Sequence, residues 1–178
     1  MKDYKKIIPE RFYDTSYEND VDDKIKKIVK EQLNKEEGVY IYGKSGVGKT
    51  HIVCALCKHF LEHDIDVRFY NTGEFLERLR EEHNKSYEGE GGLLIKVMDF
   101  RGILVLDDIG VGKPSPWTRD RLYTLLSKRY DSKWPVFFTS NFDLESLKVE
   151  FGGDDRLISR ISDMTERIKK NGEDRRLK

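Results

Sequence analysis

The sequence predicts an α/β fold: three layers, with a mainly parallel, five-stranded sheet between two layers of helices. Short β-rich runs alternate along the chain with amphipathic runs, which is the order that βαβ units require. The run "ILVL" at 103–106 is apolar at every position, as expected of a strand that is buried on both faces. The chain has 178 residues, the size of one ordinary domain. We therefore expect a single sheet with helices on both sides.

Each expected element follows from a local pattern. Strands are expected where β-branched and aromatic residues cluster between turn residues: 38–43, 66–72, 102–110, 134–141 and 165–172. Helices are expected where apolar residues recur at helical spacing, as Ile52, Leu56 and Phe60 do: 49–63, 73–84, 93–100, 118–133 and 154–164. Glycine-rich 86–92 and proline-containing 111–117 are expected to be loops.

Charge and composition exclude some classes of protein. Lys+Arg and Asp+Glu are both 33, so the formal net charge is zero although 37% of residues are charged. Nucleic-acid binding would therefore need a local basic surface. No stretch approaches the ~18 apolar residues of a membrane span, and the first twelve residues lack the apolar core of a signal peptide. We expect a cytoplasmic protein without a membrane partner.

Cys54 and Cys57 form a C-x-x-C pattern between His51 and His59. On a helix, at about 100° per residue, these four side chains spread over about 200° and cannot converge on one metal ion. We expect both cysteines to be packing residues.

The stretch "GKSGVGKT" after the first expected strand matches G-x-x-x-x-G-K-[ST], in which backbone N–H groups cradle phosphates. The lysine reaches the β and γ phosphates, and the hydroxyl coordinates Mg²⁺. The expected nucleotide-binding residues are Gly43, Lys44, Ser45, Gly46, Val47, Gly48, Lys49, Thr50 and His51.

Acidic and amide side chains follow two other expected strands. Asp107, at the end of "ILVLDD", is expected to hold Mg²⁺ together with Thr50, and Asp108 to orient or deprotonate the attacking water. Asn141, after "PVFFTS", is expected to contact the γ-phosphate or the water. A GTPase is disfavoured because the Asn-Lys pair at Asn84 is not followed by aspartate as in N-K-x-D. A small-molecule kinase is disfavoured because the 86–92 segment has no arginine for a lid.

Several motifs together resemble the AAA+ ATPase domain of the DnaC-type replicative helicase loaders and the IstB-type transposition ATPases, and more distantly the DnaA initiators. These motifs are "IPERF", "GKSGVGKTH", "FYNTGEFLERLR", "ILVLDDIG", "SKRY", "FFTSN", "RLISRI" and "NGEDRR". The resemblance extends from about Ile8 to Arg176. It implies a P-loop NTPase of the AAA+ class that uses ATP and Mg²⁺ and self-associates into an ATP-dependent oligomer or filament. The implied partners are a replicative DNA helicase and single-stranded DNA.

The resemblance also implies roles for arginines. Arg160 matches the arginine finger that completes the site of a neighbouring subunit, and Arg156 matches a second arginine one turn earlier. Arg176, or Arg175 beside it, matches a sensor-like arginine. The alternative for Arg156 and Arg160 is simple pairing with the aspartates at 154, 155 and 163.

The chain departs from the loader pattern at both ends. Only about forty residues precede the phosphate loop, so the chain is expected to be an excised ATPase domain or a short version with its partner contact near the start. We divide it into an N-terminal segment, 1–37, for adenine-side or partner contact and an ATPase domain, 38–178, without a separate helical lid. Phe12, Tyr13 and Tyr17 are candidates to hold adenine.

Single-stranded DNA would be held by cations that follow its backbone. The candidates flank the Asp107-Asp108 motif on both sides, and the alternative is that they form solvated helix faces: Arg78, Arg80, Lys85, Lys113, Arg119, Arg121, Lys128 and Arg129. The expected function is an ATP-dependent assembly factor that loads or remodels a replicative helicase. The alternatives are an IstB-like transposition helper and a nucleotide-dependent switch or scaffold with negligible turnover.

Overall fold

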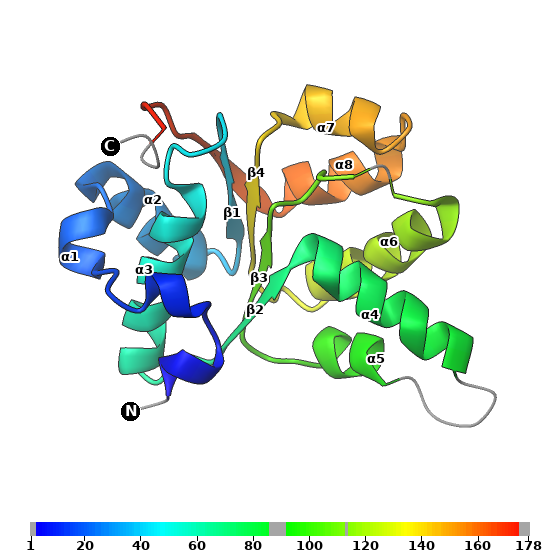
Figure 1. The fold of residues 1–178 in the computed structure, drawn as a ribbon, viewed down its shortest axis with the longest axis horizontal. Helices are drawn as coiled ribbons and strands as arrows, with labels where there is room; N and C mark the ends of the chain where they lie inside the picture. The colour runs from blue at the N-terminus through cyan, green and yellow to red at the C-terminus, as the bar shows by residue number, and fades with distance from the viewer. Residues whose placement is uncertain (1–2, 86–91, 113, 175–178) are drawn as a thin grey trace.

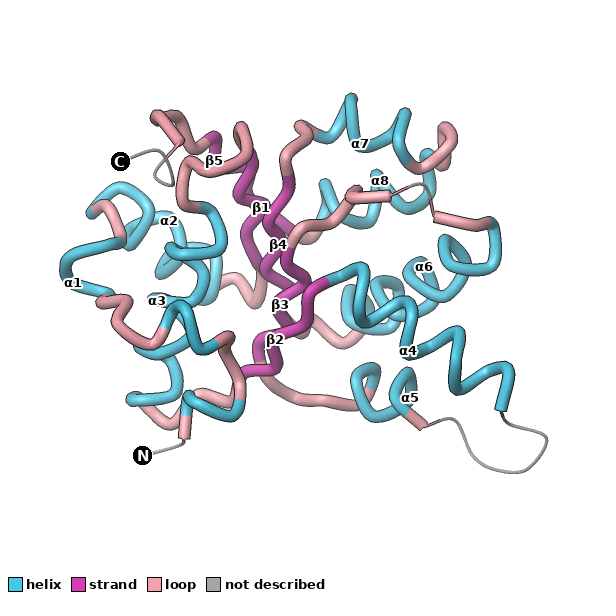
Figure 2. Tube along the Cα trace, viewed as in Figure 1, coloured by secondary structure: helices cyan, strands magenta, loops and turns pink. Residues whose placement is uncertain are grey.

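A computed structural model describes residues 3–85, 92–112 and 114–174. Its centre is one five-stranded sheet in the order β2-β3-β4-β1-β5, with every neighbouring pair parallel (Figure 2). The strands are β1 (Gly38–Tyr42), β2 (Val67–Asn71), β3 (Ile103–Asp107), β4 (Val136–Ser140) and β5 (Thr165–Lys169). Each strand lies inside its expected range, and the predicted α/β fold is confirmed.

Helices cover both faces of the sheet (Figure 1). One layer contains short turns and helices from the start of the chain together with the helix after β1: η1 (Tyr4–Lys6), η2 (Glu10–Phe12), α1 (Tyr17–Asp20), α2 (Asp23–Asn34) and α3 (Lys49–Glu62). The other layer contains the remaining helices: α4 (Thr72–Lys85), α5 (Leu93–Met98), α6 (Pro116–Asp131), α7 (Leu144–Glu150) and α8 (Asp155–Asp163). None of the helices in the described ranges is long and apolar enough to cross a membrane.

Strand residues alternate between two apolar cores. Val105 and Phe137 belong to the core on the α2–α3 side, whereas Leu106 and Phe138 belong to the core on the α4–α8 side. This follows from the pleat, because successive side chains point to opposite faces. Ile8 and residues of α2 also belong to the first core, so the N-terminal segment packs directly on the layer that carries the phosphate loop.

Three helices were not expected. α2 buries Ile25 and Val29, and α7 begins after Asp143, whose side chain accepts a hydrogen bond from Ser146 N–H. α1 is a single turn capped in the same way by Ser16. Short or strongly charged helices such as these depend mainly on packing for their stability, so sequence periodicity signals them weakly.

Both cysteines lie on α3 and pack in the core on the α2–α3 side, as predicted. Cys54 and Cys57 are buried and unbridged, and burial raises the pKa of both thiols far above its ordinary value. Neither thiol is available as a thiolate at neutral pH.

Arg129 corrects one expectation. Its side chain is fully buried in α6, where the guanidinium donates to the carbonyl oxygens of Val97, Phe100, Gly102 and Pro135. Burial lowers the pKa of the Arg129 guanidinium to about 9, so it remains charged at neutral pH. The expected DNA contact at Arg129 is therefore wrong, because the guanidinium ties α6 to the segment before β3. Lys113 and the side chain of Lys85 lie outside the described part of the chain.

Candidate nucleotide site

The phosphate loop connects β1 to the first turn of α3. Gly48 has φ 94° and is the N-cap of α3, and Gly46 has φ 79°, a backbone conformation that residues other than glycine rarely adopt. The N-terminus of α3, a helix of 14 residues, therefore faces the concavity of the loop. Free N–H groups and the helix dipole at such a terminus favour an anion.

Lys49 joins the loop to the end of β4. Its Nζ donates to Gly43 O and Lys44 O, both at 2.9 Å, and to Asn141 Oδ1 at 2.8 Å. Lys49 is only 5% exposed, whereas Asn141 is exposed beside it. Lys49 and Asn141, which were predicted from separate motifs, are thus hydrogen-bonded to each other.

Asp107 and Thr50 meet in the same way. Thr50 Oγ1 donates to Asp107 Oδ1 at 2.9 Å, and Thr139 Oγ1 donates to the same oxygen at 2.6 Å. Burial raises the pKa of the Asp107 carboxyl to about 6, with the charge of Asp108 adding to it, while the hydroxyls of Thr139 and Thr50 oppose the rise. A buried carboxylate beside a hydroxyl offers the hard oxygen ligands that Mg²⁺ prefers, so these residues fit the expected metal.

Asp108 is turned out of the strand by a left-handed backbone, with φ 56°. Its N–H donates to Thr139 Oγ1 at 2.9 Å, so one hydroxyl bonds both aspartates. Asp107 is consequently buried against Thr50 and Thr139, and Asp108 lines the cavity that is described next. The sequence placed Thr139 at the end of β4 but did not indicate this bridging position.

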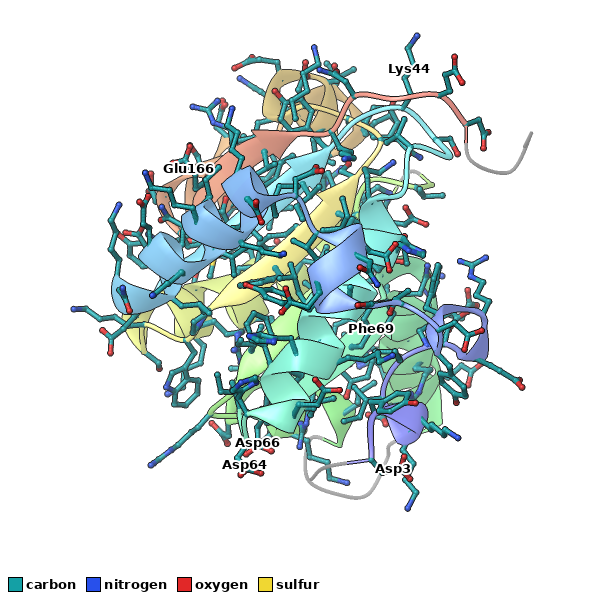
Figure 3. All side chains as sticks on the ribbon, turned by 90° about the vertical axis from the view of Figure 1, so that its left-hand side faces the viewer. Asp3, Lys44, Asp64, Asp66, Phe69 and Glu166 are labelled. Atoms are coloured by element: carbon teal, nitrogen blue, oxygen red, sulfur yellow. The ribbon has the colours of Figure 1, made fainter. Side chains whose placement is uncertain are left out.

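A cavity of about 320 Å³ brings most of the predicted residues together. Its predicted lining residues are Ser45, Gly46, Gly48, Lys49, Thr50, His51, Asp108 and Asn141. Val47 is instead buried, and Lys44 is exposed and extends away from the molecule (Figure 3).

Two further lining residues come from the N-terminal segment. Arg11 and Phe12 form one wall, with the Arg11 guanidinium 4.6 Å from the Phe12 ring centroid. Tyr13 and Tyr17 face elsewhere: the Tyr13 hydroxyl donates to Lys5 O, and Tyr17 stacks on His59. Of the three aromatic candidates for adenine, the structure places Phe12 at the cavity.

His51 and Lys58 hold the N-terminal segment against α3. His51 Nε2 lies 2.7 Å from Asp20 Oδ1, and Lys58 Nζ donates to Tyr13 O and Thr15 O, both at 2.6 Å. These contacts fix the position of Phe12 next to the phosphate loop.

The segment after β5 also reaches the loop. Lys170 N–H donates to Tyr42 O at 2.7 Å, and the Asp174 carboxylate lies against Gly46. The sensor candidates Arg175 and Arg176 follow directly but lie outside the described residues.

Arg156 and Arg160 lie on α8 and do not line this cavity. Arg156 lies 3.3 Å from Asp154 and stacks on Tyr123, so part of the simple-pairing alternative is observed. Arg160 stacks instead on Tyr130 of α6, with its guanidinium carbon 4.5 Å from the ring centroid. Two tyrosines two turns apart on α6 thus support both arginines of α8.

The parallel sheet, the phosphate loop on α3 and the acidic and amide groups at the ends of β3 and β4 define a P-loop nucleotide-binding protein of the AAA+ class. The sequence matches the IstB-like ATP binding protein family over residues 6–178. The chain belongs to this family, as the motifs predicted.

Two curated proteins and one solved structure illustrate the relationship. The chain is 31% identical to the replicative helicase loader DnaI of Bacillus subtilis (strain 168) over 156 residues, 82% of this chain and 49% of that protein. It is 34% identical to an ATP-binding protein in an insertion sequence of Mycobacterium tuberculosis over 110 residues, 61% of this chain and 42% of that protein. The chain therefore spans about half the length of the curated relatives it matches.

The fold is also that of a solved loader. The crystal structure of the DnaC helicase loader superposes with a TM-score of 0.76 at 22% identity, covering 92% of this chain and 100% of that one. At this identity the likeness establishes the fold.

Proposed function

We propose that this protein is a cytoplasmic, ATP-hydrolysing assembly factor that loads or remodels a replicative DNA helicase on single-stranded DNA. The observation that carries the proposal is that Lys49, Thr50, Asp108 and Asn141 line one cavity at the N-terminus of α3, with Asp107 hydrogen-bonded to Thr50. The similarity to a replicative helicase loader over 82% of the chain supports the choice of partner.

In this proposal the residues divide the work of hydrolysis. Lys49 leaves the carbonyl oxygens of the loop to hold the β and γ phosphates, and Thr50 and Asp107 hold Mg²⁺, which neutralises charge on the phosphates when bound. Asp108, turned toward the cavity, accepts a proton from the attacking water or orients it. Asn141 contacts the γ-phosphate or the water.

Arg160 acts on a neighbouring subunit. The cavity of its own subunit does not include Arg160 among its lining residues, and a guanidinium presented to a γ-phosphate in trans is worth about 10³-fold or more in rate. This part of the proposal requires an ATP-dependent oligomer. Residues 1–37 serve as the adenine-side and partner contact, with Phe12 against the base.

Steady-state ATP hydrolysis with and without single-stranded DNA tests the catalytic assignment. Asp108→Asn is expected to bind ATP and to lose turnover, with Asp143→Asn, a helix-cap change away from the cavity, as the matched control. Unchanged turnover in Asp108→Asn would overturn the assignment. Negligible turnover of the unaltered protein under every condition would favour a switch or scaffold.

Subunit mixing tests the trans arrangement. Arg160→Ala is expected to bind ATP without hydrolysing it. Lys49→Ala is expected not to bind ATP. A mixture of the two is expected to recover part of the activity, because Arg160 of one chain then meets an intact site on the other. No recovery in a sample that forms oligomers would assign Arg160 a structural role.

A transposition helper is the second candidate, favoured by the 34% identity to an insertion-sequence ATP-binding protein. Pull-down with a hexameric replicative helicase discriminates between the two. A complex that depends on the nucleotide supports the loader, and its absence together with nucleotide-dependent binding to a transposase supports the helper.

A further inference from the structure

The β2 edge of the sheet is open. β2 stands at the end of the strand order and pairs only with β3. In the described ranges, no hydrogen bond between two backbone groups outside the strand ladders involves residues 67–71. One row of main-chain donors and acceptors on β2 is therefore available, and such a row is a template for another extended chain.

A cavity of about 710 Å³ follows this edge. All residues of β2, from Val67 to Asn71, line it. Successive strand residues point to opposite faces of the sheet, so a cavity that touches every one of them must run along the edge. At about 3.3 Å per residue, the edge spans roughly 16 Å, the length of five extended residues.

Segments from both layers form the walls of this groove. Residues 6–9 stand on the α3 side, and Glu74, Phe75 and Arg78 of α4 stand on the other. Figure 1 shows the N-terminal turns in blue and the start of α4 on either side of β2. Both walls belong to well-packed elements, because Ile8 and Phe75 are buried in the two cores.

The groove is basic at its rim and apolar between the charges. Lys6, Arg11, Arg68 and Arg78 line it, and the one exposed carboxylate among its lining residues is Glu74. Arg11 also lines the nucleotide cavity, and Arg68 donates to Lys96 O, so Lys6 and Arg78 are the cations that belong most directly to the groove. The only other lining carboxylate is Asp107, which is 3% exposed and hydrogen-bonded to Thr50 and Thr139. Ile7 and Phe69 provide the apolar surface.

We propose that the groove along β2 binds an extended, acidic segment of a partner protein, which pairs with β2 as a sixth strand. Main-chain pairing supplies affinity. The acidic side chains of the segment meet the basic rim, and its apolar side chains meet Ile7 and Phe69. A strand of nucleic acid matches the cations but leaves the free amides and carbonyls of β2 without a complementary row. This inference does not depend on the proposed function.

Fluorescence anisotropy with a labelled heptapeptide of alternating glutamate and valine, without nucleotide, tests the proposal. The peptide is expected to bind, its lysine-for-glutamate counterpart is expected not to, and N-methylation of alternate residues along one peptide edge is expected to weaken binding at least tenfold. N-methylation removes only backbone donors, so a peptide that binds equally well with and without it would overturn the strand pairing.

Protein variants test the basic rim. Arg78→Glu is expected to weaken peptide binding about tenfold without a change in melting temperature, because this side chain is exposed. Glu74→Arg is expected to strengthen binding, with a small loss of stability because Glu74 lies in the first turn of α4. Arg167→Glu, on the opposite edge strand β5, is the matched control and is expected to have no effect. Binding of a thymidine oligonucleotide that Arg78→Glu abolishes, with no binding of any peptide, would overturn the proposal in favour of a nucleic-acid groove.

Discussion

Replacement of Arg129 by methionine is expected to destabilise the protein by about 3–5 kcal/mol. The buried guanidinium donates to four carbonyl oxygens, of which Pro135 O keeps a second donor, Leu104 N–H. The carbonyls of Val97, Phe100 and Gly102 each lose a charged donor, and a buried polar group without its partner costs about 1–3 kcal/mol. Methionine fills most of the vacated volume, and the removal of a buried charge offsets part of the lost stability. The estimate therefore lies below the summed cost of the three unpaired carbonyl groups.

Urea and thermal unfolding measure this effect. For a chain of this size, about 3–5 kcal/mol corresponds to a fall in melting temperature of roughly 6–20 °C. Lys128→Met, one residue earlier and exposed, is the control and is expected to change stability by less than about 1 kcal/mol. An Arg129→Met protein that keeps its melting temperature but loses affinity for single-stranded DNA would refute the structural role and restore the DNA contact.

Three other predictions concern the site. Burial raises the pKa of Asp107 from 3.8 to about 6, so the native state holds an extra proton between these values and stability falls as the pH rises through them. Asp107→Asn in EDTA should therefore raise stability by up to about 3 kcal/mol at pH 7.5 and by almost nothing near pH 4; a difference independent of pH in thermal melts would contradict this. Phe12→Ala should weaken ATP binding roughly tenfold in calorimetry and leave inorganic triphosphate binding unchanged, whereas equal losses for both ligands would remove Phe12 from the base. Tyr130→Ala should lower ATP turnover about three- to tenfold without changing ATP affinity. Tyr130→Phe should retain activity, because only the aromatic ring holds Arg160. Identical behaviour of the two variants would show that the ring does not position Arg160.

The phosphate loop and its partners were predictable because their signals are local or topological. The glycines and Lys49 of the loop are contiguous, so one motif specifies the cradle. Asp107 and Asn141 are distant in sequence, but Asp107 ends β3 and Asn141 follows β4, and the carboxyl ends of parallel strands lie at one edge of the sheet. The structure shows this proximity in two hydrogen bonds, one between Asn141 and Lys49 and one between Asp107 and Thr50.

Other features depend on contacts that the local pattern does not contain. Arg11 and Phe12 reach the cavity only because Lys58 and His51 hold the N-terminal segment against α3. Thr139 is an ordinary strand residue in the sequence and becomes the bridge between two aspartates only when β3 and β4 pair. Each of these positions is set by an element far away in the chain.

The sequence by itself determined the phosphate cradle, the alternation of strands and helices, and the edge of the sheet at which the polar residues gather. Only the tertiary structure decided which charged side chains face solvent. Arg129 and Arg78 are both arginines on amphipathic helices, yet the first is buried under four carbonyl oxygens and the second stands at the rim of the β2 groove. Periodicity indicates that a helix has a buried face. Whether a charged side chain can be buried there depends on the carbonyl oxygens that neighbouring elements place within hydrogen-bonding distance of it.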